Sequence, residues 1–123
     1  MLLLIDDDLL MRALLKPYLE RAGFETVAAE DGVRALELVR DKPPEAIILD
    51  VVMPEMDGLA VLRSLKTNET AKSIPVIIIT AKYDRLTEEE AKRWGAAGYL
   101  TKPFSPAQLV AEIRRVTRNL NHN

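Results

Sequence analysis

The feature that most constrains this chain is a short apolar run that stops at a single carboxylate. Residues 47–49 are apolar, Asp50 follows them, and a loop that contains Pro54 and Gly58 comes next. An apolar run of this length, bounded by turn residues, predicts a buried strand of a parallel sheet. Asp50 then lies where the strand leaves the core. Ligands of open α/β sheets bind at that edge, so we expect Asp50 to carry the function.

The composition narrows the classes of protein to consider. A chain of 123 residues predicts one domain, which we place at residues 1–120, with a frayed tail at 121–123. The net charge of −2 indicates no bulk attraction to nucleic acid or to an anionic membrane. The absence of cysteine excludes a disulfide frame, a thiol nucleophile and a thiolate metal site. No signal peptide or membrane-spanning run is recognisable, so we expect a cytoplasmic protein.

Strand and helix patterns alternate along the whole chain. The expected strands are 2–5, 25–29, 46–49, 76–79 and a brief fifth strand that begins at 99–100 and ends at 102–103. The expected helices are 9–22, 33 to before 43, 59–65, about 84–94, and from after 106 to 120. An apolar stripe in the first helix comprises Leu10, Leu14, Leu15, Tyr18 and Leu19, and we expect Pro17 to kink that helix. This alternation predicts an α/β fold, a five-stranded parallel sheet in the flavodoxin-like order 2-1-3-4-5 with helices on both faces.

Polar residues follow four of the five expected strands. They are Asp6 with Asp7 after the first strand, Asp50 after the third, Thr80 after the fourth and Lys102 after the fifth. In a parallel sheet these ends share one edge, so we expect three carboxylates to converge within a few ångströms. Close carboxylates repel, so either their pKa values rise or a cation neutralises them, and Mg²⁺ suits carboxylate oxygens. Asp50 would then be a carboxylate nucleophile towards phosphorus, with the Lys102 ammonium and the Thr80 hydroxyl near the phosphoryl oxygens.

Four motifs in this order resemble the receiver (phosphoacceptor, CheY-like) domain of two-component response regulators. Asp6-Asp7 resembles the acidic pair, the stretch from Asp50 to Gly58 the phosphorylation loop, and Thr80-Ala81 the switch hydroxyl. The stretch Tyr99-Leu100-Thr101-Lys102-Pro103-Phe104 resembles the switch aromatic with the family's lysine. The resemblance covers essentially the whole chain. It implies a phosphorelay switch with self-phosphorylation and self-dephosphorylation in cis, and no enzyme that turns over a substrate.

The resemblance also implies roles for individual residues. Asp50 accepts the phosphoryl group from a histidine kinase or a histidine phosphotransfer protein. Mg²⁺, with Mn²⁺ as an alternative, is held by Asp6, Asp7, Asp50 and the backbone carbonyl of Val52. Lys102 and Thr80 bind the phosphoryl group, and the surface near Thr80 and Tyr99 switches for a protein partner as Tyr99 turns inward. The Lys102–Pro103 peptide bond is cis.

Each motif also has a plainer interpretation. The acidic run 6–8 is favourable at any helix N-terminus, and Asp8 is better read as the N-cap than as a ligand. Thr80, Lys102 and Tyr99 would each be unremarkable alone. His122 is the only histidine and lies in the tail, so the phosphoryl donor must come from outside the chain.

Other functions fit the residues less well. A phosphohydrolase of the haloacid dehalogenase type needs a second aspartate where this chain has Val52. A flavin or nucleotide binder needs a Gly-rich loop after the first strand, where three acids stand instead. A phosphorylation-independent scaffold would not need the full acceptor set. The output is either a downstream protein partner or an effector domain of a longer parent chain, without direct contact to nucleic acid or membrane.

Three surface features bear on partners. Gly95-Ala96-Ala97-Gly98 lacks the acids that many DNA-binding relatives use in a dimer through the fourth and fifth helices, which argues against that dimer. Arg114, Arg115 and Arg118 look like a solvated face. Leu9, Met11 and Leu15, next to the site, form either a kinase-docking patch or part of the core.

Two positions that vary in the family, Val52 and Lys82 here, are expected to tune the lifetime of the acyl phosphate. Val52 offers only methyl groups and cannot orient an attacking water, which predicts a moderately long-lived acyl phosphate. We therefore expect Val52→Asn to speed the loss of the phosphoryl group, measured by intact mass after removal of the donor. An unchanged rate would contradict this role of Val52.

Overall fold

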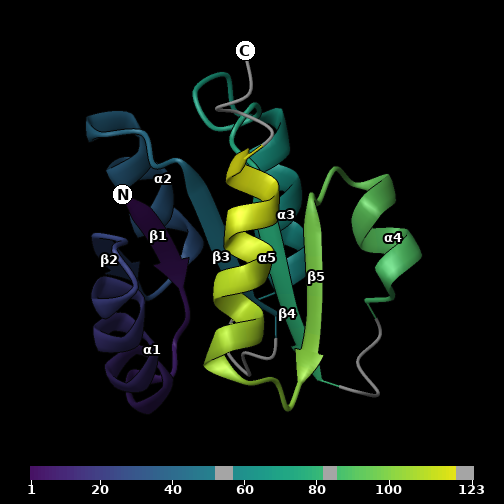
Figure 1. The fold of residues 1–123 in the computed structure, drawn as a ribbon. Helices are drawn as coiled ribbons and strands as arrows, with labels where there is room; N and C mark the ends of the chain where they lie inside the picture. Colours follow the sequence, from purple (N-terminus) through teal and green to yellow (C-terminus); the bar gives the residue numbers. More distant parts are fainter. Residues whose placement is uncertain (52–56, 82–85, 119–123) are drawn as a thin grey trace.

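The computed structural model describes residues 1–51, 57–81 and 86–118. The strands are β1 (Leu2–Ile5), β2 (Thr26–Ala29), β3 (Ala46–Asp50), β4 (Val76–Ala81) and β5 (Gly98–Lys102). The helices are α1 (Leu9–Arg21), α2 (Gly32–Asp41), α3 (Gly58–Thr67), α4 (Glu88–Arg93) and α5 (Pro106–Arg118) (Figure 1). The alternating pattern predicted from the sequence is confirmed.

All strands are parallel, and their order in the sheet is β2-β1-β3-β4-β5, as predicted. The register pairs Ile5 with Leu49, Asp50 with Ile79, and Ala81 with Lys102. The carboxyl ends of the strands therefore share one edge, and the arrowheads of β1, β4 and β5 point to it in Figure 1. This edge carries the polar residues that follow the strands.

The sheet is buried on both faces. In β1, Leu2 and Leu4 pack into a cluster with buried residues of α1 and α5, whereas Leu3 and Ile5 pack with those of α2 and α3. Successive side chains of a strand point to opposite faces, so each strand contributes to both clusters. Strands covered on both sides are apolar throughout, which explains the continuous apolar runs in the sequence.

Helix α1 is a single helix that includes Pro17, and the Asp8 carboxylate caps it by accepting from the N–H groups of Leu10 and Met11. The predicted apolar stripe is wrong at two positions, because Leu10 and Leu14 are 68% and 64% exposed. Neighbouring residues of a helix point about 100° apart, so the side that buries Leu15 turns Leu14 towards solvent.

Helix α4 is shorter than the sequence suggested. It begins at Glu88, where we expected about residue 84, because Thr87 forms the N-cap and its hydroxyl accepts from the Glu90 N–H at 3.1 Å. Three glutamates fill the first turn of α4, where negative charge is favourable. Strand β4 extends beyond its predicted end, to Ala81, whereas β5 ends at Lys102, as predicted.

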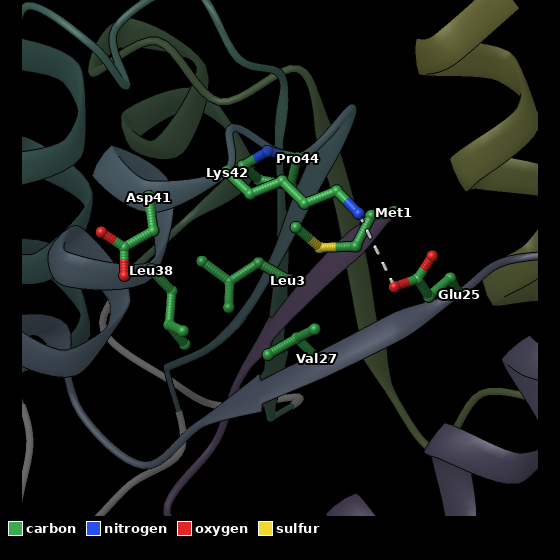
Figure 2. Close-up of a pocket in the computed structure, with 8 residues that line it drawn as sticks. All are labelled: Met1, Leu3, Glu25, Val27, Leu38, Asp41, Lys42 and Pro44. Carbon is green, nitrogen blue, oxygen red and sulfur yellow. Dashed lines mark ion pairs between the residues drawn. The ribbon is translucent and has the colours of Figure 1, made fainter.

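A small pocket of about 210 Å³ lies at the opposite edge of the sheet, where the strands begin. Its apolar floor includes Leu3, Val27 and Leu38, and the ion pair between Lys42 and Glu25, 3.9 Å long, lies at its rim (Figure 2). The pocket is therefore separate from the edge that carries Asp50.

Gly58 opens α3 and packs tightly against the residue that follows β3. A Cβ atom at Gly58 would lie 2.5 Å from Val51 Cβ and 2.7 Å from Val51 Cα. We expect Gly58→Ala to lower the free energy of unfolding by about 1–3 kcal/mol, because strand and helix must move apart. The measurement is urea-induced unfolding.

Gly32→Ala is the matched control, because its Cβ would meet only the end of the Val61 side chain, at 3.1 Å. We expect a clearly smaller loss for Gly32→Ala. Equal stability of Gly58→Ala and the parent protein would show that the contact with Val51 imposes no constraint.

Candidate functional site

Asp50 is the last residue of β3, and its side chain is only 1% exposed. A buried carboxylate is costly unless it is paired. Its Oδ2 atom lies 2.8 Å from Lys102 Nζ. Since β4 separates β3 from β5, the lysine reaches across the end of β4 to make this pair. The structure thus brings together the carboxylate and the ammonium that the sequence singled out.

Asp6 follows β1 and is also 1% exposed. Its Oδ1 accepts from the Asp8 N–H at 2.8 Å, whereas its Oδ2 is buried without a hydrogen-bond partner among the residues that the structure describes. Burial raises the pKa of Asp6 to about 6; the Asp8 N–H lowers it, the neighbouring Asp50 carboxylate raises it further, and Lys102 lowers it. Two buried carboxyl groups therefore share one ammonium.

Asp7 is half-buried, and the chain bends there. We expected three carboxylates to converge; within ranges 1–51, 57–81 and 86–118, however, no three acidic or histidine side chains form a group that could hold a metal ion. The expected cluster is thus a close pair, Asp6 and Asp50. The pair still fits Mg²⁺, which commonly uses one or two carboxylates and keeps several waters, and the unbonded Asp6 Oδ2 is an available ligand atom.

Thr80 lies near the carboxyl end of β4, and Tyr99 lies near the start of β5. Thr80 is fully buried, and its hydroxyl donates to the backbone carbonyl of Ala81 at 3.3 Å. The Tyr99 hydroxyl donates to the backbone carbonyl of Leu86 at 2.9 Å. The Lys102–Pro103 peptide bond is cis, the isomer that the resemblance implied. Val52 and Lys82, predicted to tune the phosphoryl lifetime, lie outside the described residues.

A contact between α5 and β5 was not predicted from the sequence. Arg115, expected to be solvated, binds Glu112 Oε1 through Nε at 2.7 Å and the backbone carbonyl of Ala97 at 2.8 Å. Glu112 Oε2 accepts from the Tyr99 N–H at 3.3 Å. The hydrogen bond from the Arg115 guanidinium is the main cause that holds the pKa of Glu112 below its usual range. The i,i+3 spacing of Glu112 and Arg115 was a signal for their ion pair, but nothing local pointed to Tyr99.

An apolar groove lies beside the site, between α1 and the loop that follows β5. It has a volume of about 600 Å³ and is lined by Met11, Leu14, Leu15, Tyr18, Arg21, Lys102, Pro103, Phe104 and Pro106. Leu15 is 4% exposed and belongs to the core, whereas Leu9 is 73% exposed. Of the three residues considered for a docking patch, Leu15 is therefore mainly a core residue.

The family of the chain follows from a comparison with family models. The model described as "Response regulator receiver domain" matches residues 2–114. The chain therefore belongs to the response regulator receiver domain family. Members act in two-component signalling as phosphoacceptor switches, a kinase phosphorylates an aspartate, and they generally bind Mg²⁺ at that site.

Two curated relatives show the similarity in sequence. The chain is 37% identical over 117 residues to the phosphate regulon transcriptional regulatory protein PhoB of Pseudomonas aeruginosa, covering 95% of this chain and 51% of PhoB. It is 38% identical over 117 residues to the transcriptional regulatory protein SrrA of Staphylococcus aureus, covering 95% of this chain and 47% of SrrA. The chain thus spans about half the length of these relatives.

Solved structures show the similarity in fold. The receiver domain of NtrX from Brucella abortus has a TM-score of 0.87 at 30% identity, covering 96% of this chain and 98% of that one. The chemotaxis response regulator CheY4 of Vibrio cholerae has a TM-score of 0.82 at 32% identity, covering 94% and 96%. Among the described helices, none has the length and apolar character to span a membrane.

The raised pKa of Asp6 predicts how the stability of the protein depends on pH and on Asp6→Asn. Its folded value of about 6 exceeds the ordinary 3.8, so ionised Asp6 costs the metal-free protein stability at neutral pH, and the cost fades as the pH falls towards 4. In chelator, Asp6→Asn should therefore raise the free energy of unfolding at neutral pH by about 1–3 kcal/mol, and by little below pH 4.

Urea unfolding across this pH range is the measurement, and added Mg²⁺ should stabilise the parent more than Asp6→Asn. Asp8→Asn is the control, because asparagine caps a helix as well as aspartate does and Asp8 is exposed. If the free energy of unfolding of both variants depended on pH in the same way, burial of Asp6 would not be the cause of that dependence.

Proposed function

We propose that this chain is a phosphorelay switch in which Asp50 accepts a phosphoryl group from a histidine kinase or a histidine phosphotransfer protein. The observation that carries the proposal is the buried Asp50 carboxylate, paired with Lys102 at 2.8 Å beside the Asp6 carboxyl group. A structural ion pair alone would not need a second buried acid, which raises the electrostatic cost of the site. A site built for a dianionic group and a cation does need this arrangement.

The transfer is a displacement at phosphorus. A carboxylate oxygen of Asp50 attacks the phosphorus of the donor phosphohistidine, the new O–P bond forms, and the N–P bond breaks with its electron pair returning to the imidazole. The Lys102 ammonium, which neutralises Asp50 before transfer, then stabilises the phosphoryl oxygens. The buried position of Asp50 keeps bulk water from the acyl phosphate.

Asp6, Asp7, Asp50 and the backbone carbonyl of Val52 would hold Mg²⁺. When bound, the ion neutralises charge that develops on the phosphoryl oxygens. The buried Asp6 Oδ2, which has no hydrogen-bond partner among the described residues, supports this assignment. The ionised form of Asp6 is the ligand, so metal binding weakens as the pH falls through about 6.

Thr80 and Tyr99 transmit the chemical state of Asp50. The Thr80 hydroxyl now donates to Ala81, and rotation about its χ1 angle would let it donate to a phosphoryl oxygen instead. Tyr99 packs against the core beside the loop between β4 and α4 and holds the Leu86 carbonyl. Movement of Thr80 would change the space beside Tyr99 and so the surface offered to a partner.

The groove between α1 and the β5–α5 loop suits the phosphoryl donor. It reaches Lys102, which pairs with Asp50, and the exposed Leu14 together with Pro103 and Phe104 offers apolar surface. We propose a cytoplasmic switch whose output is a protein partner or an effector domain of a longer chain. The net charge of −2 argues against direct binding of this domain to nucleic acid.

Intact mass after incubation with acetyl phosphate and Mg²⁺ tests the acceptor. We expect the protein to gain one phosphoryl mass, and Asp50→Asn to gain none, because an amide oxygen is a far weaker nucleophile. Asp8→Asn removes the same charge nearby and should still be phosphorylated. Lys102→Ala should be phosphorylated more slowly, since it loses the ammonium. Equal gain in Asp50→Asn and the parent would contradict the proposal, and so would steady release of phosphate without a phosphorylated protein.

A further inference from the structure

Strand β5 forms an edge of the sheet, with β4 as its neighbour. Edge strands present main-chain groups that need partners from outside the sheet. Here α5 supplies them: Glu112 accepts from the Tyr99 N–H, and Arg115 donates to the Ala97 carbonyl. Glu112 and Arg115 also pair with each other at 2.7 Å. Two charged side chains of one helix thus hold the start of β5.

Tyr99 is held at both ends. Its main chain is bonded to Glu112 on α5, and its hydroxyl is bonded to the Leu86 carbonyl, just before α4. Its ring packs against the cluster that includes α2, α3 and α4, whereas α5 packs against the opposite face. Tyr99 therefore links elements on opposite faces of the sheet.

The approach of Glu112 depends on a glycine. A Cβ atom at Gly98 would lie 2.9 Å from Glu112 Oε2, so a side chain there would displace the carboxylate. The carboxylate stays ionised in this place, because Arg115, the Tyr99 N–H and Lys92 of α4 all lower the pKa of Glu112. Glycine, glutamate and arginine thus form one arrangement around the main chain of Tyr99.

We propose that Glu112, held by Arg115, is a positioning residue for Tyr99. The inference rests on the proposed function of Tyr99. Glu112 holds the main chain of β5 in the place from which the Tyr99 hydroxyl reaches Leu86. Loss of Glu112 therefore weakens the contact of the Tyr99 hydroxyl with the Leu86 carbonyl, although it removes no group of the Asp50 site.

The first test uses the unphosphorylated protein. Fluorotyrosine labelling gives one ¹⁹F signal for each of Tyr18, Tyr83 and Tyr99, and Tyr99→Phe identifies the last. In Glu112→Ala and in Gly98→Ala, we expect the Tyr99 signal to shift and the Tyr99 amide to exchange about tenfold faster, as for loss of a hydrogen bond to a charged group. Tyr18 should not change.

Matched variants separate positioning from a general loss of stability. Arg114→Ala changes an exposed arginine next to Arg115 and should leave the Tyr99 signal in place. Glu112→Gln keeps an oxygen acceptor for the Tyr99 N–H and should restore most of the parent signal. If Glu112→Ala lowered stability but left the Tyr99 signal and amide exchange unchanged, the positioning role would be overturned.

The second test measures coupling to the site. Beryllofluoride with Mg²⁺ imitates the phosphoryl group, and the Tyr99 signal is followed as its concentration rises. We expect the midpoint to differ at least about threefold between the parent and Glu112→Ala, the scale of a weak coupling. Equal midpoints would overturn the coupling. If the parent bound beryllofluoride without any response of Tyr99, the switch role of Tyr99 would fail and this inference with it, whereas phosphorylation of Asp50 would stand.

Discussion

The site depends on two carboxyl groups buried together at the carboxyl edge of the sheet. Asp6 and Asp50 are each 1% exposed, and Lys102 pairs with Asp50 at 2.8 Å. Such a pair is stable only if something compensates its charge, and burial and proximity raise the pKa of Asp6 to about 6. The surrounding fold keeps these groups together because apolar clusters cover both faces of the sheet. In the proposed function, this unfavourable negative charge would attract the metal ion.

The same edge connects this chemistry to the surface. Lys102 ends β5, and Tyr99 lies three residues earlier on that strand. The strand therefore carries both the Lys102 ammonium of the site and Tyr99, whose hydroxyl donates to the Leu86 carbonyl. Because β5 is at the edge of the sheet, it has one neighbouring strand, β4, and contacts such as that of Glu112 with Tyr99 have more influence there than on a central strand.

Much of this could be predicted from residues alone. The apolar runs and their polar ends indicated a parallel sheet and placed Asp50, Lys102 and Asp6 at one edge of it, because the ends of parallel strands meet at the same edge. Predictions failed where the rotation of a helix about its axis decides which of its side chains are buried. Leu10 and Leu14 fit a helical stripe but face solvent. Neither residue differs in type from its neighbours, so sequence carries no signal for these outcomes.

The sequence by itself determined the class of fold, the edge that carries the chemistry, and the residue types available there, since hydrophobic periodicity and turn residues are local properties. Only the tertiary structure decided which groups meet. Lys102 reaches Asp50 across the end of β4, and Asp6 Oδ2 has no hydrogen-bond partner among the described residues. Arg115, although its side chain is 53% exposed, binds Glu112 and the Ala97 carbonyl. These contacts join residues far apart along the chain, and their distances and burial are set by how whole elements pack.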